Sequence, residues 1–379
     1  MSGVYVIGAG MTQFKPQPQT EVHELGREAA WAAILSSGVD PTAIEMAHAG
    51  HAYQGQCFGQ KVLLKIGLTR IAIANYENAC ASGASAVWGL YNAIKAGQAD
   101  IGIAIGAEKL FSPTGGFTPM VADDLESSMG RVMPSVFAMA AQKHMHRYGT
   151  TREQLAKIAV KNRRNGIRNP YSPWREQITS EQVLNSPMIA DPLTRLSCCP
   201  VSDGAAAVIM ASAKVAKRYT SKPVEIRSAV LASGIRNGVG MADDHSEMTI
   251  RAAKQAYEQA GIGPSDIDVC ELHDPFTIAE LIHYEDLGFC AAGEGGRGVD
   301  EGWFDLDGKV AVSPSGGLLA RGHPLGATGV AQIAELFWQL RDECGERQVR
   351  DAKVGLAHTV GGGVTEIEAG ATSVHILSV

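Results

Sequence analysis

A cysteine among small residues is the first candidate for chemistry in this sequence. Cys80 lies in the segment ENACASGASAV, where Ala, Ser and Gly leave space around a thiol. The Asn78 side chain can accept free backbone N–H groups of a helix that begins there, which places Cys80 in the first turn. Because the positive end of a helix favours a thiolate, we expect a lowered thiol pKa and a nucleophile. The alternative is an inert buried cysteine, the commoner environment of a thiol.

A histidine in the second half of the chain stands in a comparable position. His323 lies in the segment SGGLLARGHPLGATG, and Pro324 suits the first position of a helix. His323 would then lie at the helix entrance, where the positive helix end keeps an imidazole neutral and able to take a proton. The alternative is a histidine that only caps the helix.

Three further histidines are weaker candidates. His273 follows a predicted strand in ELHDPF and could donate a hydrogen bond to an oxyanion, or could be a loop histidine held by Asp274. His358 ends a predicted strand before the glycines 361–363, which let a ligand approach the backbone, and is a candidate second acid/base. His144 lies on a predicted amphipathic helix, where surface histidines are common.

Short β-branched runs alternate with amphipathic helical patterns, which predicts an α/β protein. The order of these patterns repeats, so that VYVIGAG corresponds to VEIRSAVLAS, AHAGHAYQG to CELHDPFTI, IAIANYENAC to VAVSPSGGLL, and IGIAIGAE to VGLAHTVGGG. A pseudo-twofold repeat would bring the two helix starts together, and Cys80 would then meet His323 across the joint. We expect strands over 4–10, 46–52, 71–75, 100–108, 224–233, 267–274, 309–315 and 352–360, and helices over 21–37, 82–96, 247–260 and 326–341.

A stretch of different character separates the two repeats. We expect an N-terminal half over 1–108 plus 201–220, an inserted loop domain over 109–200 and a C-terminal half over 221–379. The insertion would cover the face where the strands end, which is where α/β sheets bind ligands. Its Met- and Gly-rich part, 110–140, is expected to shape the substrate pocket or to bind a partner. Its basic run, 161–168, is expected to be a solvated face or to meet substrate phosphates.

Composition limits the kind of protein. The 379 residues are 45% apolar and carry a formal charge of −7, which argues against a nucleic-acid platform. No apolar run is long enough for a membrane helix, and no signal peptide precedes the first strand. Seven cysteines in a large chain fit a reduced cytoplasmic compartment, and their spacing indicates no metal site.

Five segments together resemble the thiolase family: ENACASGASA, SDGAAA, HDPFT, SGGLLARGHPLGATG and HTVGGG. The resemblance runs in order over the whole chain, and it is strongest to the sterol-carrier-protein type. It implies two βαβ-rich halves in a five-layered αβαβα core with an inserted loop domain. It also implies an acetyl-CoA acetyltransferase-like enzyme that cleaves or forms a 3-oxoacyl-CoA, with coenzyme A or acyl-CoA as substrate and no bound cofactor. A homodimer or tetramer is implied as well, and relatives of this type can work beside a small OB-fold, zinc-ribbon subunit.

The resemblance also implies roles for individual residues. Cys80 matches the nucleophile that takes the acyl group, and His323 matches the histidine that activates it. His273 matches an oxyanion-hole histidine, and His358 matches the histidine of the last Gly-rich block. We expect further substrate contacts from Ser315, Gly316, Gly361, Gly362 and His144.

Three positions differ from the family pattern. Thiolases carry a second cysteine as acid/base, and the two places for it hold Thr359 and Pro275 here, while Ser313 stands where an asparagine is usual. The proton shuttle is therefore His358, His323, a water or another residue. Two other functions stay open for this reason. One is a CoA-independent C-acyltransferase acting on an aromatic or other carbon acceptor, and the other is a non-thiolytic subunit, either an aldolase or an acyl-CoA-binding scaffold.

Overall fold

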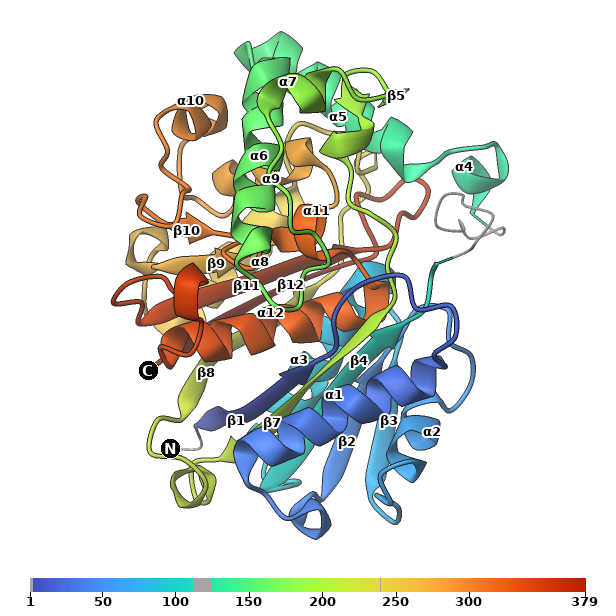
Figure 1. Ribbon diagram of the computed structural model, residues 1–379, viewed down its shortest axis with the longest axis vertical. Helices are drawn as coiled ribbons and strands as arrows, with labels where there is room; N and C mark the ends of the chain where they lie inside the picture. Colours follow the sequence, from blue (N-terminus) through green and yellow to red (C-terminus); the bar gives the residue numbers. More distant parts are fainter. Residues whose placement is uncertain (1–2, 112–123, 239) are drawn as a thin grey trace.

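The structure is a computed structural model that describes residues 3–111, 124–238 and 240–379. Ten strands form one mixed sheet in the order β10-β9-β11-β12-β8-β1-β7-β4-β2-β3 (Figure 1). These strands are β1 (Val4–Met11), β2 (Met46–Gly50), β3 (Ala72–Tyr76), β4 (Ile101–Glu108), β7 (Gly204–Ser212), β8 (Val224–Ala232), β9 (Val269–Glu271), β10 (Ala311–Val312), β11 (Val354–Gly361) and β12 (Ala371–Ser378).

The sheet consists of two five-stranded halves with the same topology. The first half has the order β3-β2-β4-β7-β1 and the second has the order β10-β9-β11-β12-β8. In each half the first three strands are parallel, and the last two join through antiparallel pairs. The halves are connected by a short antiparallel pairing of β1 with β8. The internal repeat predicted from the sequence is therefore present strand by strand.

Helices cover both halves and fill the space between them. Helices α1 (Val22–Ser37) and α2 (Phe58–Leu64) pack on the outer face of the first half. Helices α8 (Glu247–Ala260) and α9 (Thr277–Asp286) pack on the outer face of the second. Between the halves lie α3 (Ser82–Lys95) and α12 (Leu325–Leu340). These elements form the five layers, α, β, α, β and α, that the family resemblance implies.

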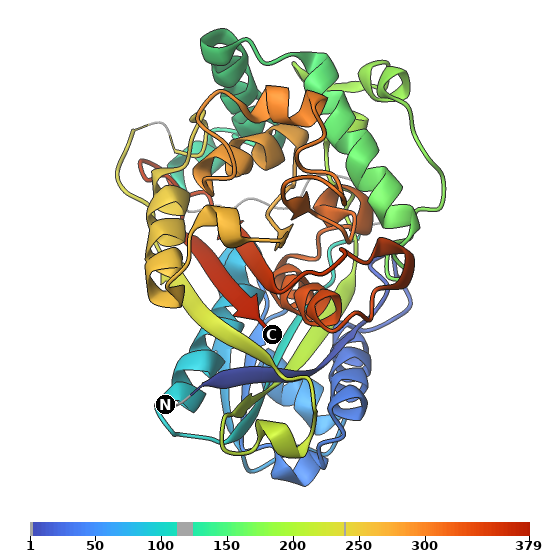
Figure 2. The same cartoon turned by 90° about the vertical axis from the view of Figure 1, so that its left-hand side faces the viewer.

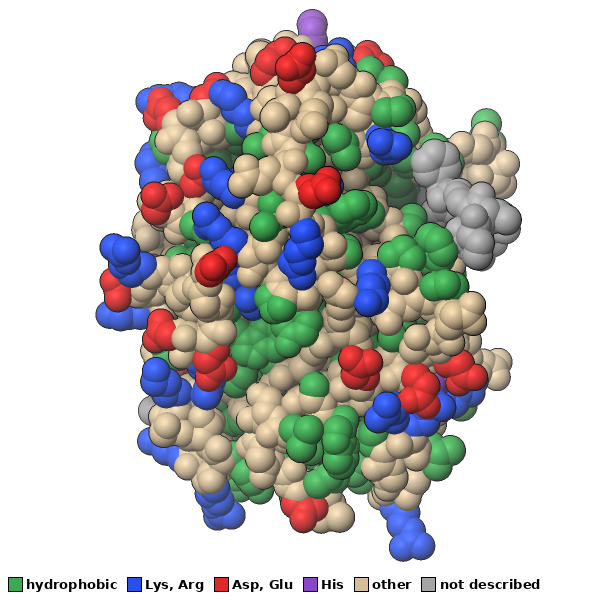
Figure 3. Space-filling model, viewed as in Figure 1, with side chains coloured by type: hydrophobic (Ala, Val, Ile, Leu, Met, Phe, Trp, Pro, Cys, Tyr) green, Lys and Arg blue, Asp and Glu red, His purple; other side chains and the backbone are tan. Residues whose placement is uncertain are grey.

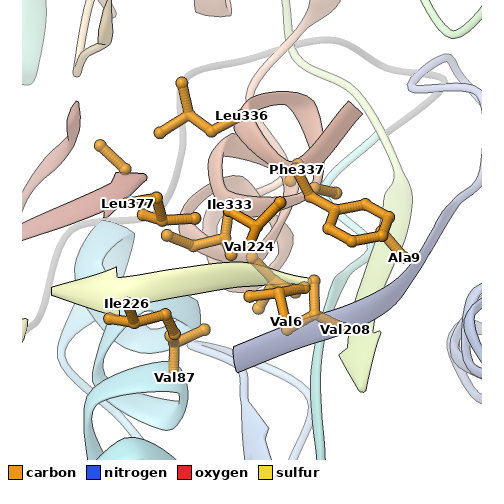
Figure 4. Close-up of a cluster of buried hydrophobic side chains, with 14 of the residues drawn as sticks. Val6, Ala9, Val87, Val208, Val224, Ile226, Ile333, Leu336, Phe337 and Leu377 are labelled. Atoms are coloured by element: carbon orange, nitrogen blue, oxygen red, sulfur yellow. The ribbon is translucent and has the colours of Figure 1, made fainter. Parts of the chain in front are cut away.

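The central layer holds the largest shared core. Figure 4 shows side chains from α3, α12 and both sheet halves meeting there. The labelled residues are Val6, Ala9, Val87, Val208, Val224, Ile226, Ile333, Leu336, Phe337 and Leu377. Burial of such aliphatic and aromatic side chains supplies most of the driving force for folding.

The first turns of α3 and α12 approach each other closely because glycines lie at the contact. A Cβ atom on Gly83 would lie 2.3 Å from the carbonyl oxygen of Gly326, and one on Gly329 would lie 2.4 Å from the backbone nitrogen of Ala84. Side chains at these positions would force the helices apart. The residues just before the two helices, which include Cys80 and His323, are thereby brought together as the repeat predicts.

Residues 124–200 lie over the second half of the sheet (Figure 1, Figure 2). Residues 112–123, which belong to the expected 110–140 pocket segment, lie outside the described residues. The elements here are α4 (Leu125–Ser128), α5 (Met133–Tyr148), α6 (Arg152–Ile167), α7 (Ser180–Leu184), β5 (Met188–Ala190) and β6 (Leu193–Thr194). Two short helices of the second half complete this end, α10 (Gly295–Asp300) and α11 (Gly317–Arg321).

The basic run 161–168 is not the solvated face that the sequence suggests. Lys161 is buried, pairs with Glu280 at 2.6 Å and donates to the carbonyl of Val312. Arg163 is buried as well and stacks on Trp174, 4.4 Å from the ring centre. Buried cations of this kind anchor α6 to the second half. The exposed charges on the face in Figure 3 mix both signs.

Candidate active site

Cys80 lies in a tight turn between β3 and α3. The turn is a 3-10 helix, Ala79–Ala81, and Ala79 has a φ of +47°, a backbone conformation that non-glycine residues seldom adopt. The Ser82 hydroxyl holds the turn together, because it accepts from the backbone N–H of Asn78 at 2.9 Å and donates to the carbonyl of Ala79 at 2.6 Å. The thiol therefore sits on a well-defined bend, and it keeps partial exposure.

Two expectations about Cys80 are wrong. The Asn78 side chain does not cap the helix but donates to the hydroxyl of Ser85 at 2.8 Å. The thiol pKa is not lowered, because burial raises the pKa of Cys80 to about 12 and the nearby Glu108 acts in the same direction. Desolvation of the thiolate outweighs the helix dipole here. The resting group is thus a thiol, which needs a base to become a nucleophile.

His323 has the properties of that base. Its Nδ1 lies 2.7 Å from the hydroxyl of Thr328, and that hydroxyl donates to the carbonyl of Pro324 at 3.0 Å. The hydroxyl must then accept from Nδ1–H, which leaves Nε2 with its lone pair free. Among the described residues Nε2 has no hydrogen-bond partner.

His323 is neutral, as expected, but for a different reason. Burial lowers the pKa of His323 to about 3, and the charge of Arg321 acts in the same direction. Desolvation of the imidazolium, rather than the positive end of α12, is the main cause. Helix α12 begins at Leu325, with Pro324 as its N-cap, one residue later than predicted.

Cys80, His273 and His323 meet in one cluster. The Cys80 sulfur and one ring nitrogen from each histidine all lie within 4.8 Å of one another. The two imidazole rings meet edge to face, with their centres 5.2 Å apart. Neither ring nitrogen of His273 has a hydrogen-bond partner among the described residues, so the ring is available to a bound group. The same ligand types bind zinc, so an added zinc ion would compete for this cluster.

His358 does not belong to that cluster. Its Nε2 lies 3.2 Å from the hydroxyl of Thr249, and its ring packs edge to face on His283 with the centres 4.4 Å apart. The next residue, Thr359, is also engaged, since its hydroxyl donates to Gln332 at 2.6 Å. The two candidates from the last Gly-rich block are therefore occupied by neighbouring side chains.

His144 is not placed to bind substrate. It is fully buried, with Nδ1 2.8 Å from the hydroxyl of Thr150 and Nε2 3.3 Å from the carboxyl group of Glu285. It joins α5 to α9 and is a structural residue.

Ser315 and Gly316 also make contacts within the protein. The Ser315 hydroxyl donates to Glu271 at 2.7 Å, and a Cβ on Gly316 would lie 2.6 Å from Cα of Gly166. Ser313, in the family's asparagine position, is buried with a φ of +52°.

The glycines after β11 contact the protein rather than an open ligand path. A Cβ on Gly361 would lie 2.1 Å from the carbonyl oxygen of Asn78 and 2.5 Å from the backbone nitrogen of Ala81. Gly361 therefore lets β11 back directly onto the Cys80 turn. Gly362 has a φ of +77°, which favours glycine, and stands clear of close contacts.

Glu108 is a site residue that the sequence did not reveal. Its buried carboxyl group accepts from the backbone N–H groups of Ala52 at 2.8 Å, Tyr53 at 3.0 Å and Gly326 at 3.0 Å. It thus connects the loop after β2 to the first turn of α12. An acid directly after the apolar strand IGIAIGA was the available signal.

Comparison with known proteins places this geometry in context. The family model described as "Thiolase, N-terminal domain" matches residues 4–214, and "Thiolase C-terminal domain-like" matches residues 235–377. An acetyl-CoA acetyltransferase from Methanothermobacter thermautotrophicus is 41% identical over 390 residues, covering 100% of both chains. Sterol carrier protein 2 from Bos taurus is 39% identical over 384 residues, covering 94% of this chain and 70% of its own.

A solved structure gives the same assignment. The structure titled "Ltp2-ChsH2(DUF35) aldolase" superposes with a TM-score of 0.83 at 25% identity, covering 99% of this chain and 97% of that one. Together these matches confirm the family resemblance that the motifs indicate, including its sterol-carrier-protein type.

Proposed function

The chain belongs to the thiolase family of acyltransferases, and from that premise we propose that Cys80 carries the acyl group in a thiolytic cycle on a 3-oxoacyl-CoA. The observation that supports this most strongly is the cluster of Cys80, His273 and His323, with Nε2 of His323 free to take a proton. The relative from Methanothermobacter is named as an acetyl-CoA acetyltransferase, which fits coenzyme A and acyl-CoA as substrates. Either direction of the reaction uses the same groups.

The cycle follows from the protonation states of the site. His323 Nε2 takes the proton of Cys80, and the thiolate attacks the C3 carbonyl carbon. His273 and the protonated His323 can donate to the oxyanion that forms. The C2–C3 bond then breaks, and its electron pair goes to C2, which takes the proton from His323. Finally the sulfur of coenzyme A attacks the acyl-cysteine, and the proton of its thiol returns to Cys80.

We assign the proton delivery at C2 to His323 rather than to His358. The proton that His323 takes from Cys80 balances the one that C2 needs, so no second acid is required. His358 is bonded to Thr249 and lies behind His283, away from the sulfur cluster.

The test is a thiolysis assay with acetoacetyl-CoA and coenzyme A. The wild-type protein is expected to consume acetoacetyl-CoA only when coenzyme A is added, and Cys80→Ala is expected to lose this activity. Cys290→Ala, which removes another partly exposed thiol, is the matched control and should stay active. Consumption by Cys80→Ala would refute the proposal. An acyl adduct on Cys80 that is transferred to a carbon acceptor but not to coenzyme A would favour the CoA-independent acyltransferase.

A second candidate is carbon–carbon cleavage of the retro-aldol type. It is favoured by Thr359 at the position of the second cysteine, with its hydroxyl held by Gln332, and by the similarity to a structure titled as an aldolase. Cleavage of a 3-hydroxyacyl-CoA to an aldehyde or ketone by the Cys80→Ala variant would support this reaction. Absence of such cleavage in both wild type and variant would exclude it.

We also propose a homodimer that forms through β3. This strand pairs with β2 on one side and ends the sheet on the other, where its backbone groups remain available (Figure 1). A groove lined by Ile73, Tyr76 and Trp88 runs beside it. Exposed edges of this kind favour pairing with another chain. Ala74→Lys should give monomers by light scattering, whereas Leu35→Lys on exposed α1 should not. Dimers that survive Ala74→Lys would place the interface elsewhere.

A small OB-fold, zinc-ribbon partner is a further proposal. The similar structure titled Ltp2-ChsH2(DUF35) aldolase contains a second component in its title, which motivates it. Co-expression with such a subunit should raise the thiolysis rate, and equal activity without it would exclude a requirement.

A cytoplasmic location is proposed because the Cys80 thiol must stay reduced. Within the described residues, no helix has the length and apolar character needed to cross a membrane.

A further inference from the structure

A cavity adjoins the sulfur cluster and shares His273 with it. Its walls are largely apolar and come from α5, α8, α9, β11 and the 241–248 loop. The apolar side chains include Phe137, Met241, Met248, Ile282 and Val360. Small-molecule sites typically combine such walls with a few polar groups that fix the orientation of the ligand. Because His273 also contacts the Cys80 cluster, this cavity is in the right place to hold the group attached to the reacting carbonyl.

Two polar side chains interrupt the apolar walls, and the first is His283 on α9. Its side chain is 7% exposed and lines the cavity, yet neither ring nitrogen makes a hydrogen bond to a described residue. Nδ1 lies 3.6 Å from Oδ2 of Asp286, and that oxygen accepts from the backbone N–H of Ser246 at 3.0 Å. Since Oδ2 is already an acceptor, we assign the proton of His283 to Nδ1. Nε2 is then an acceptor.

The charge state of His283 agrees with this assignment. Burial lowers the pKa of His283 to about 4, so the ring is neutral at pH 7. Its position on the helix TIAELIHYED gives no motif, which is why sequence analysis did not single it out.

The second polar side chain is Glu368. Its two carboxyl oxygens face the first turn of α8 and accept from the backbone N–H of Met248 at 3.0 and 3.3 Å. Asp243, paired with Lys143, lies at the same cavity. The polar groups of the cavity therefore offer acceptors and negative charge. Such a lining favours a ligand group that donates a hydrogen bond and disfavours an anion.

We propose that this cavity holds the acyl group and that His283 selects acyl chains that carry a hydroxyl group, while the acidic side chains exclude chains that end in a free carboxylate. The proposal rests on the proposed acyl-cysteine function, because the cavity matters only if Cys80 accepts an acyl group. The hydroxyl would donate to Nε2 of His283 and to the neighbouring Glu368. An alkyl chain would instead leave these acceptors unpaired in an apolar cavity, which is unfavourable.

The test compares three acyl-CoAs of equal chain length that end in methyl, hydroxyl or carboxylate. The rate of adduct formation on Cys80 is measured for each by intact-protein mass spectrometry. The wild type is expected to prefer the hydroxyacyl chain over the alkyl chain roughly tenfold or more, and to react least with the carboxyacyl chain. In His283→Phe, which keeps a planar ring without an acceptor, the hydroxyl preference should fall toward unity. His283→Gln, which keeps an acceptor, should restore part of it.

The matched control is His146→Phe, because His146 is exposed on α5. It should leave the substrate preference of the wild type intact. Equal rates with all three chains in the wild type, or an unchanged hydroxyl preference in His283→Phe, would overturn the selectivity proposal. If His283→Phe fails to fold, the wild-type series still decides. Absence of any adduct on Cys80 with every chain would instead refute the proposed function itself.

Discussion

Thr328 offers a sharp test of how His323 becomes a base. Its hydroxyl accepts from Nδ1–H of His323 at 2.7 Å while donating to the carbonyl of Pro324 at 3.0 Å. Thr328→Val keeps the side-chain volume and removes the hydroxyl. The buried Nδ1–H would lose its acceptor, which costs about 1–3 kcal/mol. Because about 1.4 kcal/mol corresponds to a factor of ten, Cys80 acylation should slow by roughly 5- to 150-fold. The loss arises because the ring can now place its proton on Nε2.

The assay is rapid-quench mass spectrometry of acyl-Cys80 formation from acetyl-CoA under single-turnover conditions. Thr328→Ser is the control, since it keeps the hydroxyl and should retain most of the rate. Melting temperatures of both variants show whether folding is affected. Acylation of a folded Thr328→Val variant at the wild-type rate would refute the tautomer argument.

Three other perturbations follow from the same geometry. Gly361→Ala should displace the Cys80 turn, lower the urea midpoint by the equivalent of about 1–3 kcal/mol and slow acylation, whereas Gly263→Ala, whose Cβ would be 3.8 Å from its nearest neighbour, should do neither. Stability should fall between pH 7 and pH 5, because burial lowers the pKa values of His323, His283 and His375 to about 3, 4 and 4. The unfolded chain then binds protons that the folded chain refuses, at about 2 kcal/mol for each histidine; a higher urea midpoint at pH 5 would contradict this. Glu108→Gln should lower the pKa of the Cys80 thiol, measured from the pH dependence of its alkylation, and a raised or unchanged pKa would show that Glu108 does not act on the sulfur.

The sequence predicts the scaffold of the site well because the scaffold depends on local patterns. Periodicity and turn residues place α3, α8 and α12 within one residue of their observed starts. The repeat correctly brings Cys80 and His323 together, since equivalent helices in equivalent halves must meet at the joint.

The electrostatics of the site could not be read in the same way. The Cys80 pKa moves in the opposite direction to the prediction, because burial depends on the contacts of the folded chain. Asn78 looks like a cap, but Ser85 lies one helical turn on and takes its amide. Glu108 and His283 were missed because their importance comes from distant segments that meet them in space.

The most direct test of the central claim is to locate the acyl group after a short incubation with acetyl-CoA. Peptide mass spectrometry of the wild type is expected to find one acetyl group, on Cys80, and His323→Ala is expected to form the same adduct much more slowly. Because the thiol needs a base, raising the pH should partly restore the rate of His323→Ala. An acetyl group on another cysteine, or equal acylation rates with and without the His323 imidazole, would contradict the account.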